Sequence, residues 1–417
     1  MSKLIISKMD IFGQPCMICA RTEEQHIMEL QLEPDGKNSI LNNIYIGQVD
    51  KIAPNIQAAF VRFGDGQMGY FPLAEENSVI YSASRTGNAP LRPGDEILVQ
   101  VRQDAMKGKL PALTSNLNFT GKYLVFTTGE KRIGFSGKLT KEEKGYLGRW
   151  LEEGMESVSF SNTDRPYGII VRTNAAQASR DAFLQEYQYL HYIYDKTAVK
   201  GRNRTCFSLL YRSESFYLNA VRDVYHSELE EIVTDQPQAE SMIREYLSAV
   251  CPQEIDRLRF YDDKLLPLYK LYRVETAIDE ICREKIWLSS GGFLVIQQTE
   301  AFVSIDVNSG KYTGRKKAQE TYRKINLEAA REIARQLRLR NLSGIILIDF
   351  INMENPDHQE ELFHVLQKYL RKDSVKAKAV DITPLHILEL TRQKVRRPVI
   401  EDLRELTENT ETTGNLF

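Results

Sequence analysis

The sequence predicts a multidomain α+β protein. Three observations lead to this prediction: the chain has 417 residues, residues 43–114 read as short strands, and residues 293–353 read as strand–helix–strand. A chain of this length can bury several hydrophobic cores, so more than one domain is expected. Hydrophobic residues make up 42% and charged residues 27% of the chain, as in ordinary globular proteins.

Composition narrows the function classes and the compartment. The formal net charge of −2 gives no overall attraction for nucleic acid, so any such binding must come from local patches. No apolar run approaches the length that spans a membrane, and MSKLIISKMD lacks the apolar core of a signal peptide. Five unevenly spaced cysteines are typical of a reducing compartment, and Cys16 and Cys19 are expected to be buried structural residues. We therefore expect a cytoplasmic protein with no membrane partner.

The first half of the chain begins with strands. LIISKM, PCMICAR and MELQLEP alternate as in an antiparallel meander. NIYIGQVDKI, IQAAFVRFG, MGYFPL and EILVQVRQ follow, with turn residues between them, and fit a small β-barrel. The polar segment from Glu75 to Pro90 is expected to be a flexible loop.

From residue 118 onward the pattern mixes strands and helices. Residues 122–128 and 168–173 read as strands, and Thr140-Lys141-Glu142-Glu143 is a capping box that opens a helix. A helix is expected over 175–197, a strand-like segment over 217–225 and a helix over 239–250, with Asp235 and Asp256 solvated. Near the C-terminus we expect a helix over 358–372, a strand over 375–382, a helix over 387–396 and a polar, disordered tail after Leu403.

The strand–helix–strand unit carries the first candidate site. Two apolar runs, residues 303–305 and 345–348, each end on an aspartate, Asp306 and Asp349. The helix between them has apolar residues at helical spacing, namely Tyr322, Ile325, Ala329, Ile333 and Leu337. Such a unit favours neighbouring parallel strands, so both aspartates should lie side by side where open α/β sheets place their ligands.

Two adjacent carboxylates indicate a cation site. They repel each other unless a cation or a shared proton resolves the conflict, and oxygen ligands suit Mg²⁺ or Mn²⁺. Asn308 adds an amide oxygen. The span from Asp306 to Arg340 has four acidic residues and ten basic ones, namely Lys311, Arg315, Lys316, Lys317, Arg323, Lys324, Arg331, Arg335, Arg338 and Arg340. An acidic metal pocket in a basic surface suits phosphodiester chemistry.

Simpler alternatives remain for these residues. Each aspartate alone could cap a strand, and the basic face could simply be solvated. His358 could orient a group near the metal, although a surface histidine with no such task is the favoured interpretation. A phosphate-ester metabolic enzyme would need a Gly-rich nucleotide-binding loop, and the sequence contains none.

A second candidate site binds an anion. The strand over 168–173 is expected to end where a helix begins, so free backbone N–H groups and the positive end of the helix dipole would meet there. Arg172 and Thr173 add a guanidinium and a hydroxyl, which together would bind phosphate. The alternative is that Thr173 or Asn174 is an ordinary helix N-cap.

The segments KIWLSSGGFLVIQQTEA, IDVNSG and NLEAAREIARQLRLRNLSGIILIDFINM closely resemble the ribonuclease E/G family of bacterial endoribonucleases, with weaker similarity along the whole chain. The resemblance implies that Asp306 and Asp349 hold a catalytic Mg²⁺ (or Mn²⁺) and that Asn308 supports them. It implies hydrolysis of single-stranded RNA in processing or decay, with ribosomal RNA precursors or messenger RNA as substrates and 5′-phosphate and 3′-hydroxyl ends as products. The alternative is a non-catalytic RNA-binding protein on the same scaffold.

The resemblance also implies a division into domains. Residues 1–37 and 217–281 would form an RNase H-like subdomain, 38–117 an S1-type OB-fold barrel, 118–216 a 5′-sensor domain and 282–402 a DNase I-like catalytic domain, before a disordered tail over 403–417. In the barrel, Phe60 and Tyr70 would stack on RNA bases and Lys109 would contact RNA; without the resemblance, both rings would more simply be barrel core.

In the 5′-sensor, the resemblance implies that Arg172, Thr173, Gly121 and Val125 bind the RNA 5′-monophosphate. The sequence departs from the family where Gly137 and Lys138 replace a pair of arginines, which weakens the expected contact. Because the last cysteine is Cys282, we expect no counterpart of the family's Cys-Pro-x-Cys zinc-link and small C-terminal domain. We therefore expect no zinc and no zinc-linked dimer, while the oligomeric state stays open.

Overall fold

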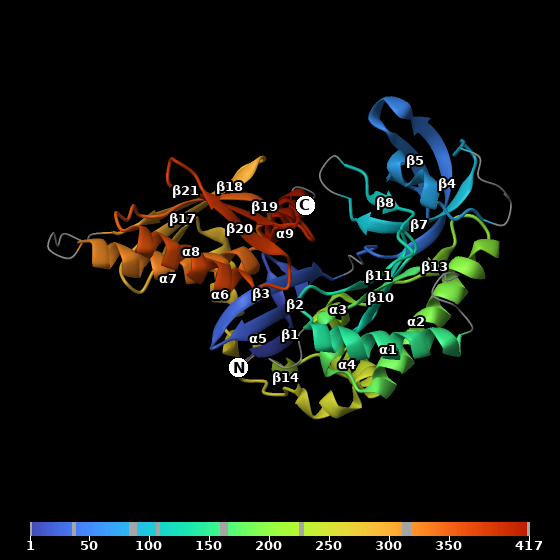
Figure 1. Ribbon diagram of the computed structural model, residues 1–417, viewed down its shortest axis with the longest axis horizontal. Coiled ribbons are helices and arrows are strands. Elements are labelled where there is room, and N and C mark those ends of the chain that lie inside the picture. Colours follow the sequence, from blue (N-terminus) through green and yellow to red (C-terminus); the bar gives the residue numbers. More distant parts are fainter. Residues whose placement is uncertain are drawn as a thin grey trace. The chain divides into compact units, whose positions relative to one another are not determined.

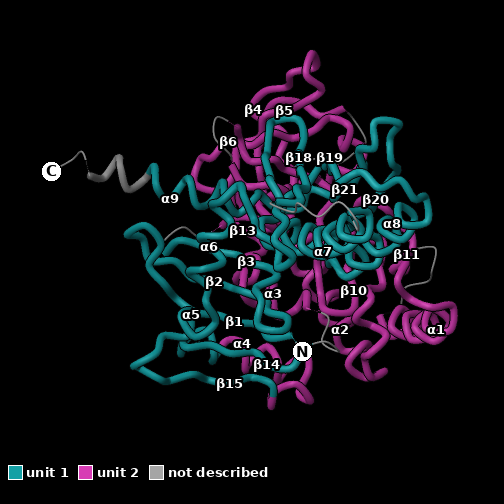
Figure 2. The backbone as a smooth tube through the Cα atoms, turned by 90° about the vertical axis from the view of Figure 1, so that its left-hand side faces the viewer, with its two compact units in different colours: residues 1–36, 229–241, 257–417 teal, residues 37–228, 242–256 magenta. Residues whose placement is uncertain are grey.

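The computed structural model describes residues 2–35, 39–82, 90–105, 109–158, 166–224, 229–310 and 318–414, the last six of these by their backbone only. The chain forms two compact units, coloured separately in Figure 2: residues 1–36, 229–241 and 257–417 are unit 1, and residues 37–228 and 242–256 are unit 2. None of the helices in the described ranges is long and apolar enough to cross a membrane. The two units together contain the mixture of helices and strands that the sequence predicts.

Unit 1 begins with the expected antiparallel meander. Strands β1, β2 and β3 are joined by two-residue turns in which both residues have positive φ, Phe12 and Gly13 in the first turn and Glu24 and Gln25 in the second. The sheet has the order β15-β14-β1-β2-β3. The bounds are β1 Ser2–Ile11, β2 Gln14–Glu23, β3 His26–Pro34, β14 Leu229–Thr234 and β15 Leu258–Phe260.

Four residues in or near this sheet bear on the expectations. Cys16 and Cys19 are buried as expected, and burial raises the pKa of the Cys16 thiol to about 11 and that of Cys19 to about 12. Asp235 is half-buried and accepts a 2.7 Å hydrogen bond from Ser7 Oγ, so the expectation that it is solvated was wrong. Asp256 is exposed, as expected.

The second sheet of unit 1 has six strands in the order β16-β17-β18-β19-β21-β20. The strands are β16 Lys285–Trp287, β17 Phe293–Gln298, β18 Phe302–Asn308, β19 Gly344–Asp349, β20 Ala377–Ile382 and β21 Ile387–Arg392. Helices α7 (Ala318–Leu339) and α8 (Pro356–Leu370) lie along one face of this sheet (Figure 1). Ile325, Ala329, Ile333 and Leu337 bury the predicted apolar stripe of α7 against the sheet.

Two predictions for the C-terminal region were wrong. Residues 387–392 form strand β21 instead of a helix, because Leu388, Leu390 and Arg392 are buried at every second position. Residues after 403 are not a disordered tail within the described range, since helix α9 runs from Val399 to Gly414. Leu403 and Leu406, each 1% exposed, pack into the core beneath the N-terminal sheet. The remaining helices assigned to this unit are α5 Leu268–Leu271 and α6 Val274–Cys282.

Unit 2 contains the expected barrel. Strands run in the order β4-β5-β6-β8-β7, and the additional pairing of β4 with β7 closes the sheet on itself. The bounds are β4 Ile44–Ala53, β5 Ala58–Phe63, β6 Gln67–Pro72, β7 Glu96–Gln103 and β8 Ala112–Thr114, with β13 Leu209–Tyr211 beside β4. The predicted loop after Glu75 is in part a 3₁₀ helix over Leu73–Ser78, because the Glu75 carboxylate accepts hydrogen bonds from Thr114 and Ser115. Residues 83–89 of that loop lie outside the described residues.

A four-stranded sheet, helices α1, α2 (Arg180–Tyr194) and α3, and most of helix α4 also belong to unit 2. The sheet has the order β11-β12-β10-β9, with β9 Asn118–Thr120, β10 Leu124–Thr127, β11 Ile133–Phe135 and β12 Gly168–Val171. Helix α1 (Lys141–Ser157) starts with the predicted capping box. Residues 216–223 form helix α3 (Phe216–Asp223) and not the strand that the sequence suggested. Helix α4 (Pro237–Val250) spans residues of both units.

Candidate functional site

The two aspartates lie side by side, as the sequence predicts. Strands β18 and β19 are parallel neighbours, and Asp306 and Asp349 are partners in their register. The preceding residues, Ile305 and Ile348, are 1% and 0% exposed and point into the core. Side chains alternate along a strand, so both aspartates project from the opposite, open face, where both are exposed.

Asn308 belongs to the same group. It follows Asp306 by two residues on β18 and therefore projects from the same face. Its Nδ2 donates a 2.7 Å hydrogen bond to Asp306 Oδ2. The Asn308 Oδ1 atom takes no part in this hydrogen bond and can serve as a ligand. Within the described part of the chain, the Asp349 carboxylate makes no hydrogen bond or ion pair. Two neighbouring carboxylates and one amide oxygen are a donor set that fits Mg²⁺ or Mn²⁺, with water or a bound phosphate completing the shell.

The predicted basic surface around this group needs correction. Arg335, Arg338 and Arg340 all turn inward: Arg335 pairs with Glu332 and Glu280, and the Arg338 side chain is 3% exposed and donates to Glu29 at 2.8 Å. Arg340 is 6% exposed, and its Nη2 donates to the carbonyl oxygens of Glu280 and Arg283. These arginines attach α7 to the rest of unit 1, so they are not available to a ligand.

Other members of the basic group differ in their surroundings. Arg323 forms a two-pronged pair with Glu361, at 2.6 Å for both contacts, and Arg331 pairs with Glu24 at 3.1 Å. Lys311, Arg315, Lys316 and Lys317 lie outside the described residues. The second half of α7 therefore does not supply the positive field that was predicted next to the aspartates.

The open face carries a further group that the sequence pattern did not reveal. Trp287 on β16 pairs with Phe293 on β17, which in turn pairs with Asn308 on β18. In the next row, Lys285 pairs with Val295, which pairs with Asp306. The run FLVIQQ is apolar on both sides of the strand, so alternation along it does not indicate which residues face the solvent.

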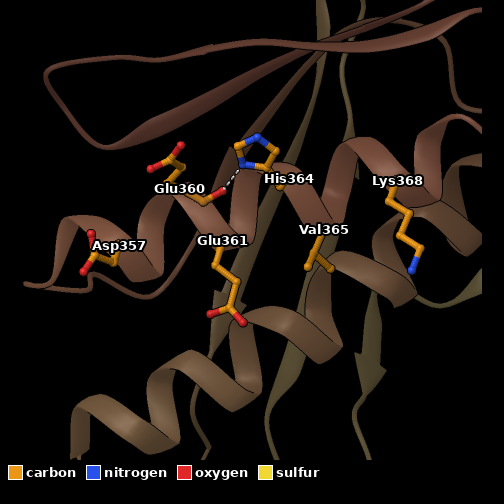
Figure 3. A pocket seen from close by; sticks show the side chains of 6 residues that line it. All are labelled: Asp357, Glu360, Glu361, His364, Val365 and Lys368. Carbon is orange, nitrogen blue, oxygen red and sulfur yellow. Dashed lines mark hydrogen bonds between the residues drawn. The ribbon is translucent and has the colours of Figure 1, made fainter.

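His358 lies in the first turn of α8 and is half-buried. Its Nδ1 is buried and has no hydrogen-bond partner among the described residues. A shallow hollow of about 410 Å³ lies further along this helix, lined by Asp357, Glu360, Glu361, His364, Val365 and Lys368. Figure 3 shows that all six side chains come from α8 alone, and none of the residues of the aspartate group lines the hollow. We therefore assign no role to it.

In unit 2, Phe60 and Tyr70 are direct cross-strand partners on β5 and β6. Neither ring belongs to the barrel core, which contains the neighbouring Val61, Phe63 and Phe71 instead. Tyr70 is 36% exposed and Phe60 is half-buried, so the two rings form a surface pair. Lys109 is exposed two residues before Pro111, whose carbonyl accepts a hydrogen bond from the Tyr70 N–H. The arrangement offers two aromatic faces, with a cation on the segment that pairs with Tyr70.

The predicted anion site has a different local structure from the one expected. Strand β12 ends at Val171, and Thr173–Gln177 form a short 3₁₀ helix. Helix α2 starts only at Arg180, with Ser179 as its N-cap, and ends at Tyr194. The prediction that a long helix begins next to Thr173 was therefore wrong, because the N-terminus of α2 lies seven residues further along the chain.

Arg172 is nevertheless held in a defined position. Its Nη1 donates to the carbonyl oxygen of Gly121 at 2.6 Å, and its Nη2 donates to Asp223 Oδ1 at 2.8 Å. Burial alone would raise the pKa of Asp223, but the charges of Arg222 and Arg172 lower it below its usual value. The Asp223 carboxylate is therefore charged and already accepts a hydrogen bond from one Nη atom of Arg172.

A buried carboxylate leaves no space for a side chain at position 121. Glu186 on α2 is 8% exposed and accepts hydrogen bonds from the backbone N–H groups of Lys122, Tyr123 and Leu124, at 2.8, 2.7 and 2.8 Å. A Cβ at position 121 would lie 2.5 Å from Glu186 Cδ. Only glycine therefore fits beside this carboxylate without movement of the loop that supports Arg172.

The other predicted members of the anion site lie around Arg172. Thr173 Oγ1 is 2.8 Å from Ser136 Oγ, in the turn that continues to the exposed Gly137 and Lys138. Val125 on β10 pairs with Ile170 on β12, two residues before Arg172. The structure thus places Gly121, Val125, Arg172 and Thr173 on neighbouring segments of one sheet end.

The chain is similar to proteins of one known family. A model of the Ribonuclease E/G family matches residues 118–395, which include the aspartate group and the anion site but not the barrel. Ribonuclease G of Salmonella typhimurium (strain SL1344) is 30% identical over 384 residues, which is 89% of this chain and 76% of the relative. Ribonuclease G of Escherichia coli (strain K12) is 30% identical over 383 residues, with the same coverage. Ribonuclease E of Haemophilus influenzae is 29% identical over 404 residues, 95% of this chain but 42% of the relative.

Proposed function

Because this chain belongs to the ribonuclease E/G family, we propose that it is an endoribonuclease that cleaves single-stranded RNA. The observation that supports this proposal most strongly is the register pairing of Asp306 with Asp349 on an open sheet face. Paired carboxylates beside an amide oxygen suit the hydrolysis of a phosphodiester, whose transition state gains negative charge.

Each residue of this group has a defined task in the proposed mechanism. Asp306 and Asp349 present carboxylates from adjacent parallel strands, and Asn308 fixes the orientation of Asp306 through its hydrogen bond. These residues would hold a divalent cation, Mg²⁺ or Mn²⁺, which when bound neutralises phosphoryl charge and makes water a better nucleophile at neutral pH. The carboxylates would repel RNA if they remained uncompensated, so the same two residues also make RNA binding at this point depend on the cation.

The remaining candidate residues would bind RNA away from the reacting bond. Phe60 and Tyr70 offer two partly exposed rings for base stacking, and Lys109 adds a charge for the backbone, as in an S1-type RNA-binding barrel. Hydrolysis would leave a 5′-phosphate and a 3′-hydroxyl.

Arg172, Thr173, Gly121 and Val125 would form a sensor for a 5′-monophosphate. Because Asp223 already pairs with the Arg172 guanidinium, a phosphate would have to share or replace that contact. The short 3₁₀ helix after Arg172 aligns fewer peptide dipoles than a long α-helix would, so its N-terminus attracts an anion less strongly. Both features predict a modest preference for the monophosphorylated end.

The direct test uses purified protein and a single-stranded RNA labelled at its 3′ end. Cleavage with Mg²⁺, loss of cleavage with a chelator and a 5′-phosphate on the labelled product would support the proposal. RNA binding without cleavage in Mg²⁺ or Mn²⁺ would instead favour the non-catalytic RNA-binding alternative.

A further inference from the structure

The open face of the second sheet carries an exposed aromatic pair beside the aspartate group. Trp287 and Phe293 are cross-strand partners, and Phe293 is the partner of Asn308. Paired residues on neighbouring antiparallel strands project to the same side, so both rings share the face of Asn308 and Asp306. The intervening residues, Ile286 and Leu294, are 7% and 0% exposed and belong to the core against α7.

The two rings are not core residues. Trp287 is 64% exposed, and its ring centroid lies 5.2 Å from that of Phe293 with the planes tilted by 59°. Lys285 Nζ lies 4.3 Å from the Trp287 centroid and 3.7 Å from the Phe293 centroid, a cation–π arrangement. Two ring faces and one ammonium group are the elements that bind a base and its phosphate.

The hairpin that carries the rings is fixed against the aspartate group. The backbone N–H groups of Ser289 and Ser290 donate to the Glu328 carboxylate on α7, at 2.6 and 3.2 Å. A Cβ at Gly292 would lie 2.8 Å from the carbonyl oxygen of Asn308, so the hairpin end packs directly on the chain at that residue. The aromatic pair is therefore positioned before any ligand binds.

The spacing suits a neighbouring nucleotide. Adjacent strands lie about 4.8 Å apart and each strand residue rises about 3.4 Å, so Phe293 and Asp306 are separated by roughly 8 Å at their backbones. A base on the rings would thus belong to a nucleotide next to the phosphodiester held at Asp306 and Asp349. A protein partner is less favoured, because a partner docked on these rings would cover the aspartate group as well.

We propose that Trp287, Phe293 and Lys285 form a subsite for the nucleotide beside the cleaved bond, with the base stacked on Trp287 and the ammonium group of Lys285 near its phosphate. This inference rests on the proposed function, and it assigns RNA contacts to the catalytic sheet in addition to those of the barrel. Stacking accepts every base, so the subsite would add affinity without sequence preference.

Tryptophan fluorescence tests the subsite independently of cleavage. The chain has two tryptophans, Trp287 and Trp150, and Trp150 lies on α1 with its ring 5.8 Å from that of Phe183. In a Trp150→Phe variant, Trp287 is the only indole. With Asp349→Asn added to prevent cleavage and Mg²⁺ present to compensate the remaining carboxylate, titration with a single-stranded oligouridylate should quench its emission saturably, at the same concentrations at which fluorescence anisotropy of a labelled copy of the RNA reports binding.

Affinity measurements supply the second arm. Trp287→Ala should weaken RNA binding roughly 5- to 150-fold, the range for one lost stack, while Trp287→Phe retains most of the affinity. The matched control is Phe302→Ala: Phe302 is 37% exposed at the other end of β18, on the same face, and its loss should leave binding unchanged. If Trp287→Ala proved unstable, the emission change and the affinity of the Trp287→Phe variant would still show whether RNA binds at Trp287.

The outcomes separate this inference from the proposed function. RNA binding and cleavage with unchanged Trp287 emission and a normal Trp287→Ala variant would overturn the subsite and leave the enzyme intact. Saturable quenching in the single-tryptophan variant, together with no cleavage by the wild type, would support the subsite and contradict the enzymatic proposal. Absence of RNA binding would overturn both.

Discussion

Replacement of Gly121 by alanine should damage the anion site from within. The new Cβ would lie 2.5 Å from Glu186 Cδ, well inside van der Waals contact. Glu186 cannot retreat freely, because three backbone N–H groups of residues 122–124 fix its carboxylate. Relief of the clash therefore requires either the loss of some of these buried hydrogen bonds or displacement of the loop.

The magnitude follows from these contacts. Overpacking of a filled interior costs about 1–3 kcal/mol, and a Gly→Ala change without strain would instead gain about 0.4–1 kcal/mol through the unfolded chain. We expect Gly121→Ala to lower the free energy of unfolding by about 1–3 kcal/mol, which corresponds to ~2–4 °C per kcal/mol for a unit of 150–250 residues. Displacement of the Gly121 carbonyl would also move Arg172, which donates to it at 2.6 Å.

Thermal unfolding and cleavage kinetics provide the assay. Gly137→Ala is the matched control, because a Cβ at position 137 would meet no heavy atom within 4 Å and the backbone there is not in the left-handed region. Gly121→Ala should melt earlier than the control and lose part of its preference for 5′-monophosphorylated RNA. Equal melting temperatures and an equal 5′ preference for the two variants would refute the idea that Glu186 fixes this loop.

Three further sets of substitutions test other parts of the molecule. Phe60→Ala and Tyr70→Ala should each weaken single-stranded RNA binding by ~1–3 kcal/mol with little change in melting temperature. Phe63→Ala in the barrel core should instead cost about 3–5 kcal/mol of stability. Large destabilisation by all three variants would show that Phe60 and Tyr70 are core residues. The wild type should prefer 5′-monophosphorylated RNA roughly tenfold, because a charged hydrogen bond contributes about 1.5–3 kcal/mol and Asp223 shares the Arg172 guanidinium. Arg172→Gln should reduce this preference while cleavage of 5′-hydroxyl RNA continues. The control is Arg204→Gln, at an exposed position; an equal preference in the two variants would exclude Arg172 from the site. Leu403→Ala should cost about 2–5 kcal/mol because Leu403 is 1% exposed, and Leu385→Ala, at 81% exposure, should change stability by less than ~0.5 kcal/mol; similar effects would show that α9 is not part of the core.

Local patterns predicted the aspartate group correctly because its geometry is local. Each aspartate ends an apolar strand, and one helix connects the two strands, so the register of Asp306 with Asp349 follows from a single supersecondary unit. The same reasoning placed the meander and the barrel strands. For Phe60 and Tyr70 the strand pattern alone favoured barrel core, whereas the family resemblance implied exposed rings; the structure shows that both rings lie outside the core.

Predictions failed where a short pattern fits two periods. Tyr217, Leu218, Ala220 and Val221 are buried at helical spacing in α3, yet over so few residues they resemble a strand. In β21 the reverse occurred, because residues 387–392 form a strand where their sequence pattern suggested a helix. The polar composition of the tail suggested disorder, whereas Val399, Leu403 and Leu406 have helical spacing and bury one face of α9.

The basic surface failed for a different reason. Arg338 pairs with Glu23 and Glu29, more than 300 residues away in the chain, and no local pattern reveals such partners. A count of basic residues along α7 therefore overstated the charge available to a ligand. Trp287 and Lys285 were missed because their relation to Asp306 depends on the pairing of three strands.

The central claim is that Asp306 and Asp349 together form the catalytic centre for RNA cleavage. The most direct measurement is the single-turnover cleavage rate of one labelled single-stranded RNA in Mg²⁺ by the wild type, Asp306→Asn, Asp349→Asn and the control Asp381→Asn, an exposed carboxylate on β20. Loss of one ligand should remove several kcal/mol of transition-state stabilisation, so each of the first two variants should cleave at least ~100-fold more slowly while it binds RNA normally. We expect this loss for both variants and a wild-type rate for Asp381→Asn; near wild-type cleavage by either Asp306→Asn or Asp349→Asn would contradict the claim.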